Sequence, residues 1–152
     1  MARITGEIVI ARPVDVVFDC VADQRNEPKY NPGMVRSEKL TDGPVDVGTR
    51  FGATMTSGRR RADMVIEVTK YDRPRTLGSK TTTTMADIEG TLTFQPASGG
   101  TRMRWSWDLR PKGAVRLLTP LVVRMGQRQE RRIWGGLKEY LEVTQKPRPP
   151  GL

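Results

Sequence analysis

TRMRWSWDL, residues 101–109, decides the fold together with the long helical segment that follows it. Its apolar side chains alternate with polar ones, which is the period of a β-strand with one apolar face: Met103, Trp105, Trp107 and Leu109. Over residues 114–143 the apolar residues recur at helical spacing instead. The one interruption there, Pro120, predicts either a kink or the true start of the helix. A long amphipathic helix after such a strand predicts that the helix covers the apolar face of a sheet.

The chain before this stretch is predicted to form strands, with two short helical segments after the first strand. Residues 3–10 alternate as a strand, residues 13–22 have the spacing of a short amphipathic helix, and a second short helix or turn falls within 23–33. Further strands are predicted at 34–40, 48–57, 62–71, 75–84 and 85–94. Short turns join them, which favours antiparallel pairing. We therefore expect an α+β fold in which a curved antiparallel sheet of about seven strands wraps around a long C-terminal helix.

Length and composition fit one domain. The chain has 152 residues, of which 1–144 are predicted to form the domain, and 145–152, with three prolines, a flexible tail. The net charge of +9 favours anionic partners without choosing among them. A single cysteine, Cys20, excludes an intrachain disulfide, and no segment has the apolar length of a membrane span or a signal peptide. These features favour a cytoplasmic location.

The sequence contains no histidine, which narrows the chemistry. Serine–histidine and cysteine–histidine nucleophiles and histidine-ligated metals are excluded. Neither a phosphate-binding GxxxxGK[ST] loop nor a dinucleotide-binding GxGxxG motif after a strand occurs. We therefore predict no metal and no cofactor, and any reaction must use carboxylates, lysine, arginine, tyrosine or hydroxyls.

Four stretches resemble one known family: IVIARPVDVVF at 8–18, residues 23–33 ending in NPG, LTDGPVDVGTRF at 40–51, and residues 130–142 of the last helix. Together they resemble the START-like (SRPBCC) superfamily, particularly its polyketide cyclase/dehydrase branch. The resemblance implies a helix-grip fold with a cavity for an apolar small molecule between the sheet and the C-terminal helix. Tyr30 stands where such proteins often carry a tryptophan before the proline.

Glu130 is the candidate catalytic residue, because the helical wheel places it on the apolar face beside Gly126. A carboxylate in an apolar cavity would have a raised pKa and could polarise or deprotonate a ligand. The alternative is a residue at the edge of that face, paired with an arginine such as Arg131. The candidate ligand-binding residues are mostly aromatic residues and methionines, which could equally be core: Tyr30, Phe51, Met55, Met64, Ile66, Trp105, Trp107, Met125 and Trp134.

Binding of an apolar small molecule, such as a lipid, a polyketide or an aromatic metabolite, is the leading hypothesis for function. The alternative is an enzyme of the polyketide cyclase, aromatase or dehydratase type, in which Glu130, Tyr30 or Arg124 moves protons or holds a carbonyl oxygen. A third hypothesis is a weak contact with an anionic membrane surface. Nucleic acid is disfavoured because no aromatic residues interleave with the basic ones of the last helix. We expect a monomer or a homodimer.

Overall fold

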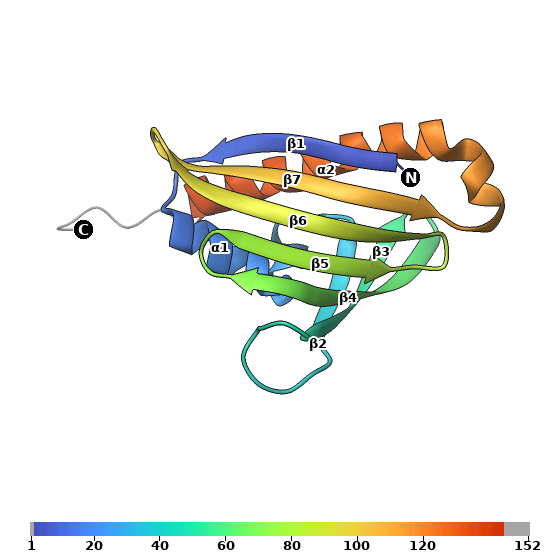
Figure 1. Ribbon diagram of the computed structural model, residues 1–152, viewed down its shortest axis with the longest axis horizontal. Helices are drawn as coiled ribbons and strands as arrows, with labels where there is room; N and C mark the ends of the chain where they lie inside the picture. The colour runs from blue at the N-terminus through green and yellow to red at the C-terminus, as the bar shows by residue number, and fades with distance from the viewer. Residues whose placement is uncertain (1, 145–152) are drawn as a thin grey trace.

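The computed structural model describes residues 2–144, so the predicted tail lies outside the described residues. Seven antiparallel strands form one sheet, in the order β1-β7-β6-β5-β4-β3-β2 (Figure 1). The sheet is not closed: β1 and β2 are its two edges. The strands are β1 (Ala2–Ile10), β2 (Met34–Lys39), β3 (Arg50–Ser57), β4 (Arg60–Asp72), β5 (Thr76–Thr82), β6 (Ala86–Ala97) and β7 (Gly100–Pro111). This arrangement confirms the predicted antiparallel sheet.

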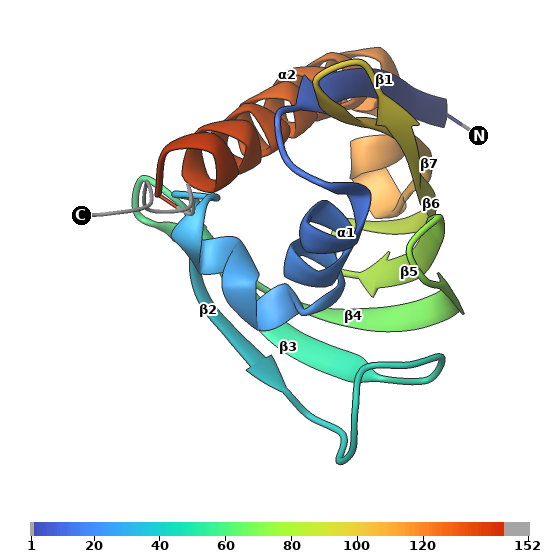
Figure 2. The same cartoon turned by 90° about the vertical axis from the view of Figure 1, so that its left-hand side faces the viewer.

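Two short helical segments follow β1, as predicted: α1 (Val14–Ala22) and the 3-10 helix η1 (Gln24–Lys29). The Asp23 side chain accepts a hydrogen bond from the backbone N–H of Arg25 at 3.1 Å, which begins η1. Viewed along the sheet, α1 and η1 lie on its concave side (Figure 2).

The C-terminal helical region consists of three segments: η2 (Gly113–Leu118), α2 (Thr119–Glu139) and a last π-helical turn, η3 (Tyr140–Thr144). Pro120 lies in the first turn of α2, where a missing N–H leaves no hydrogen bond unmade. It therefore marks the start of α2 and does not kink it. The helix lies along β1 and is held by the concave side of the sheet (Figures 1 and 2). Within residues 2–144, no helix is long and apolar enough to cross a membrane.

The core lies on the concave face between the sheet, α1 and α2, and α1 covers one end of this face. Phe18 of α1 packs edge-on against Phe94 and Tyr71, with ring centroids 5.2 and 5.3 Å apart. From α2, the side chains of Ile133, Trp134 and Leu137 are buried. Apolar residues at helical spacing therefore face the sheet, as the amphipathic pattern of residues 114–143 predicts.

The opposite end of the concave face is less covered. Along β4 the inward-facing side chains change from buried at Val68 and Ile66 to half-buried at Met64 and exposed at Ala62. This end adjoins η2, because the backbone N–H of Lys112 donates to the carbonyl oxygen of Met85 in the β5–β6 turn at 2.8 Å. The open end of the sheet and the start of the C-terminal helical region therefore lie at the same end of the molecule.

Candidate functional site

Glu130 of α2 points toward the sheet and is held by two tryptophans. Its Oε2 accepts a hydrogen bond from Nε1 of Trp134, one helical turn further on, at 2.7 Å, and another from Nε1 of Trp107 of β7 at 3.0 Å. Nothing within residues 2–144 donates to the other oxygen, Oε1. Arg131, the alternative partner considered from the sequence, is exposed and makes no ion pair with a described carboxylate. One carboxylate oxygen is therefore fixed in place while the other is left unused.

Burial raises the pKa of Glu130, although the two indole donors oppose the rise by stabilising the carboxylate. The direction is the one expected for an inward-facing Glu130. A carboxyl group with a raised pKa in a fixed orientation is a candidate acid or base.

Three aromatic rings form a row beside this carboxyl group. The rings of Tyr30 and Trp134 have centroids 6.3 Å apart, and so do those of Trp134 and Trp105. The chain has only three tryptophans, and all three lie at this site. The hydroxyl of Tyr30 and Nε1 of Trp105 are buried without a hydrogen-bond partner among the described residues. Buried polar atoms in proteins almost always have partners, so these two are candidate contacts for a ligand.

Glu27 of η1 is a second acid at the site, which sequence reasoning missed. Its Oε1 accepts from Nδ2 of Asn31 at 3.1 Å, and the same amide nitrogen lies 3.8 Å from the sulfur of Met55. Burial raises the pKa of Glu27 to about 7, and the charge of Glu130 contributes to the rise. The only signal in the sequence was a glutamate four residues before an asparagine in a polar, proline-containing segment, which is ordinary for a surface loop.

The other predicted ligand-binding residues fall into three groups. Phe51 and Ile66 are buried in the core, and Met64 is half-buried on the neighbouring concave surface of β4. Met55 joins the acidic cluster through Asn31. Met125 was predicted to line the cavity, and this placement is wrong: its side chain is 62% exposed. It follows Leu121 by one helical turn on the outer face of α2, away from Glu130.

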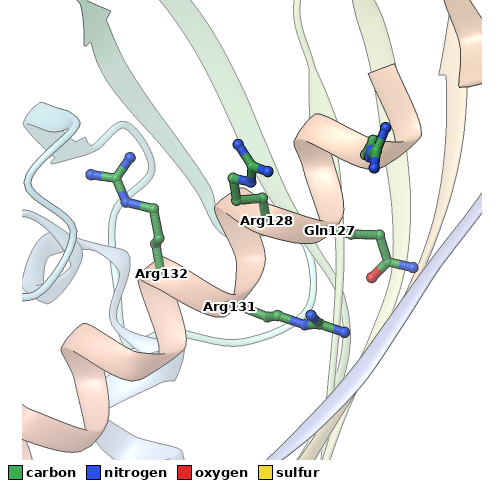
Figure 3. A pocket seen from close by; sticks show the side chains of 5 residues that line it. Gln127, Arg128, Arg131 and Arg132 are labelled. Atoms are coloured by element: carbon green, nitrogen blue, oxygen red, sulfur yellow. The ribbon is translucent and has the colours of Figure 1, made fainter. Parts of the chain in front are cut away.

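Two hollows in the described part of the chain lie outside the space between the sheet and α2. One, of about 390 Å³, lies over the basic outer face of α2, where Arg128 and Arg132 point to one side and Arg131 to the other (Figure 3). Another, of about 430 Å³, lies over outward-facing residues of β1, β6 and β7 such as Thr5 and Thr93. Neither of these two hollows is the predicted internal cavity.

Residues 2–144 contain no group of three or more potential acidic, cysteine or histidine ligands for a metal ion. Burial raises the pKa of Cys20 to about 11, so its thiol stays protonated and unreactive at neutral pH.

The model of the family described as "Polyketide cyclase / dehydrase and lipid transport" matches residues 1–142. The chain belongs to this family. No curated protein gave a match.

Solved structures share the fold of this polyketide cyclase/dehydrase and lipid transport family member at low sequence identity. A Thermus thermophilus protein is 18% identical, with a TM-score of 0.82 over 95% of this chain and 100% of its own. A START superfamily protein from Mycobacterium smegmatis is 12% identical, with a TM-score of 0.81 over 93% and 98%. The Zhui aromatase/cyclase from Streptomyces sp. R1128 is 13% identical, with a TM-score of 0.75 over 96% and 99%. At these identities the likeness shows the fold alone.

Proposed function

We propose that the chain binds an apolar small molecule in the concave space between the sheet and α2, with a polar group of that molecule against Glu130. The observation that carries this proposal is the hydrogen bonding of Glu130: two indoles hold Oε2, and no described residue donates to Oε1. Because Oε2 is held in place, the second oxygen, Oε1, is available to accept a hydrogen bond from a ligand.

The polar atoms around Glu130 indicate the chemistry of the ligand. A hydroxyl group could donate to Oε1, while the Trp105 indole could donate to a carbonyl oxygen. Two neighbouring carboxyl groups, Glu27 and Glu130, disfavour a ligand carboxylate when they are ionised. The aromatic row favours flat rings. A hydroxylated aromatic or polyketide-like molecule therefore fits better than a free fatty acid.

The open end of the concave face offers a route for entry. Met55 and Met64 are half-buried there, and methionine side chains rearrange at low cost because they are unbranched and flexible. Movement of such side chains would make room for a ligand, since neither of the two hollows described above lies at this place. The cytoplasmic location expected from the sequence is part of this proposal and is supported by the single cysteine.

A cyclase- or dehydratase-type reaction is the second candidate, favoured by the paired acids Glu130 and Glu27. Because two indole N–H groups hold Oε2, the proton would be exchanged at Oε1, and the indoles would fix the orientation of the carboxyl group. Arg124, considered from the sequence as a group holding a carbonyl oxygen, is exposed on the outer face of α2 and takes no part in this candidate. If the chain is an enzyme, Glu130→Gln should lose turnover by a much larger factor than it loses substrate binding.

Tryptophan fluorescence tests the binding proposal, because every tryptophan lies at the site. Titration with a naphthol should quench the emission to a saturable limit, whereas the matching naphthalene carboxylate should bind at least about tenfold more weakly. Glu130→Gln should narrow that difference, because it removes the charge that repels the carboxylate. Glu139→Gln, an exposed change on the same helix, is the control. A folded protein with no saturable quenching by either compound would refute the proposal.

A further inference from the structure

A second surface, distinct from the site around Glu130, exposes large apolar side chains at the start of the C-terminal helical region. Leu117 and Leu118 of η2 are 85% and 55% exposed, and Leu121 and Met125 of α2 are 52% and 62% exposed. Large apolar side chains grouped in this way on a protein surface mark interaction sites. We call this group, with the arginines beside it, the basic–apolar surface.

The arginines of this surface are Arg116, Arg124, Arg128 and Arg132, and all of them are exposed. No carboxylate in the described part of the chain lies within ion-pair distance of any of them. Arg124 and Arg128 are four residues apart, as are Arg128 and Arg132, and like charges at this spacing destabilise a helix. The arginines therefore do not serve the stability of α2, and their positive charge is available to an anionic partner.

Apolar and cationic side chains share one face of the helix. Leu121, Met125, Arg128 and Arg132 follow one another at intervals of four, three and four, which places them in a single stripe along α2. The apolar members come first and the cationic members follow. The hollow of about 390 Å³ lies over the cationic part, between Arg128, Arg131 and Arg132 (Figure 3).

We propose that the basic–apolar surface docks on an anionic lipid bilayer. Helices that lie in a membrane interface bury aliphatic side chains at the boundary between headgroups and acyl chains, while arginines pair with lipid phosphates. Both parts of the surface are needed for this partner. A nucleic acid would leave the four apolar side chains in water, and residues 113–132 contain no aromatic residue on which a base could stack.

The position of this surface gives docking a consequence for the proposed ligand. Met85, 55% exposed in the β5–β6 turn, lies beside the start of η2 and extends the apolar area. The surface therefore lies at the same end of the molecule as the open part of the concave face. Docking would hold that opening close to the bilayer, so that an apolar ligand could pass between the two. This consequence rests on the proposed ligand-binding function, whereas the docking itself does not.

Co-sedimentation with vesicles tests the proposal without any added ligand, so its outcome is independent of the binding proposal. The full chain should sediment with vesicles of equal parts phosphatidylcholine and phosphatidylglycerol and stay in solution with phosphatidylcholine alone. Arg124→Gln with Arg128→Gln should weaken binding about 30-fold. Each arginine near an anionic surface contributes about 1 kcal/mol, and the loss of two such contributions corresponds to this factor. Leu117→Ser with Leu121→Ser should weaken it by at least about tenfold at unchanged net charge. Added salt should release the protein.

The matched control removes the same charge elsewhere: Lys70→Gln with Lys80→Gln, both exposed on the sheet. This variant should lose less than half as much binding, on a logarithmic scale, as the arginine variant, because its charges lie on other elements. Circular dichroism should show that all variants fold. Equal losses in the two charge variants would overturn the proposal, as would binding that the leucine variant leaves unchanged. Tighter binding to a duplex oligonucleotide, also unaffected by the leucine changes, would overturn it in favour of nucleic acid.

Discussion

Glu27 and Glu130 are both partly buried acids, but different groups hold them. Glu130 receives two charge-stabilising indole N–H groups, whereas Glu27 receives one amide from Asn31. Burial raises the pKa of both, and each hydrogen bond limits the rise. Glu27, with one donor and an acidic neighbour, therefore holds its proton up to about pH 7.

The stability of the protein should consequently depend on Glu27 between pH 4.5 and 7. The folded chain binds the proton more tightly than the unfolded chain, whose value is near 4.5. The stabilisation is fully present below the unfolded pKa and is lost as the pH rises through the folded pKa of about 7. We expect the free energy of unfolding to fall by about 1–3 kcal/mol across this window. Urea unfolding at several pH values measures it.

Glu27→Gln removes the titrating group and should flatten this part of the pH profile, leaving the contribution of Glu130. Glu139→Gln, which changes an exposed side chain, should leave the profile as it is. The carboxyl groups of Asp23, Asp87 and Glu142 have lowered pKa values. The stability that they contribute is therefore lost only as the pH falls below the window of pH 4.5 to 7. If the pH dependence of unfolding is the same for Glu27→Gln and the wild type, the Glu27 carboxyl group is solvated in the folded protein and the account is contradicted.

At the scale of elements, the contact between α2 and the end of η1 brings the two acids together. Gly136 of α2 lies directly against the chain at Tyr30: a Cβ added there would come within 2.2 Å of the Tyr30 carbonyl oxygen. The preceding residue, Gly135, faces open space. The two adjacent glycines therefore differ in structural role: the missing side chain of Gly136 permits the close approach of α2 and the end of η1, and that of Gly135 does not.

Substituting each glycine with alanine tests this contact. Gly136→Ala should destabilise the protein by about 1–3 kcal/mol, because the backbone of Tyr30 must move away. It should also change tryptophan emission, since the Tyr30 ring packs against Trp134. Gly135→Ala should stabilise by about 0.5–1 kcal/mol through helix propensity. Thermal or urea unfolding of the two variants provides the measurement. Equal changes in stability for the two variants would show that the chain at Tyr30 does not pack against Gly136.

At the scale of the whole molecule, the sequence predicted the architecture because its strands alternate cleanly and its one long helix has a single apolar stripe. Periodicity alone places Trp105 and Trp107 on the apolar face of their strand, and their burial confirms this placement. Periodicity depends only on neighbours along the chain, so it succeeds for regular elements.

The site was harder to predict, because it depends on how segments distant in sequence meet. Glu27 lies in a 3-10 turn without a regular apolar pattern, and its burial depends on the approach of α2 at Gly136. The size of any space left between the sheet and α2 depends on side-chain packing, which the helical wheel does not describe. Met125 shows the same limit: methionine is typical of apolar interiors, yet this one lies outside beside arginines.

The central claim is that an apolar ligand occupies the concave space beside Glu130, and photochemical cross-linking tests its location directly. A hydroxylated aromatic probe carrying a diazirine should label peptides from β7 and α2 that contain Trp105 and Trp134, and the β3 peptide that contains Met55. An excess of naphthol should suppress this labelling. Labelling confined to the outer faces of the sheet and α2, or labelling that excess naphthol leaves unchanged, would contradict the account.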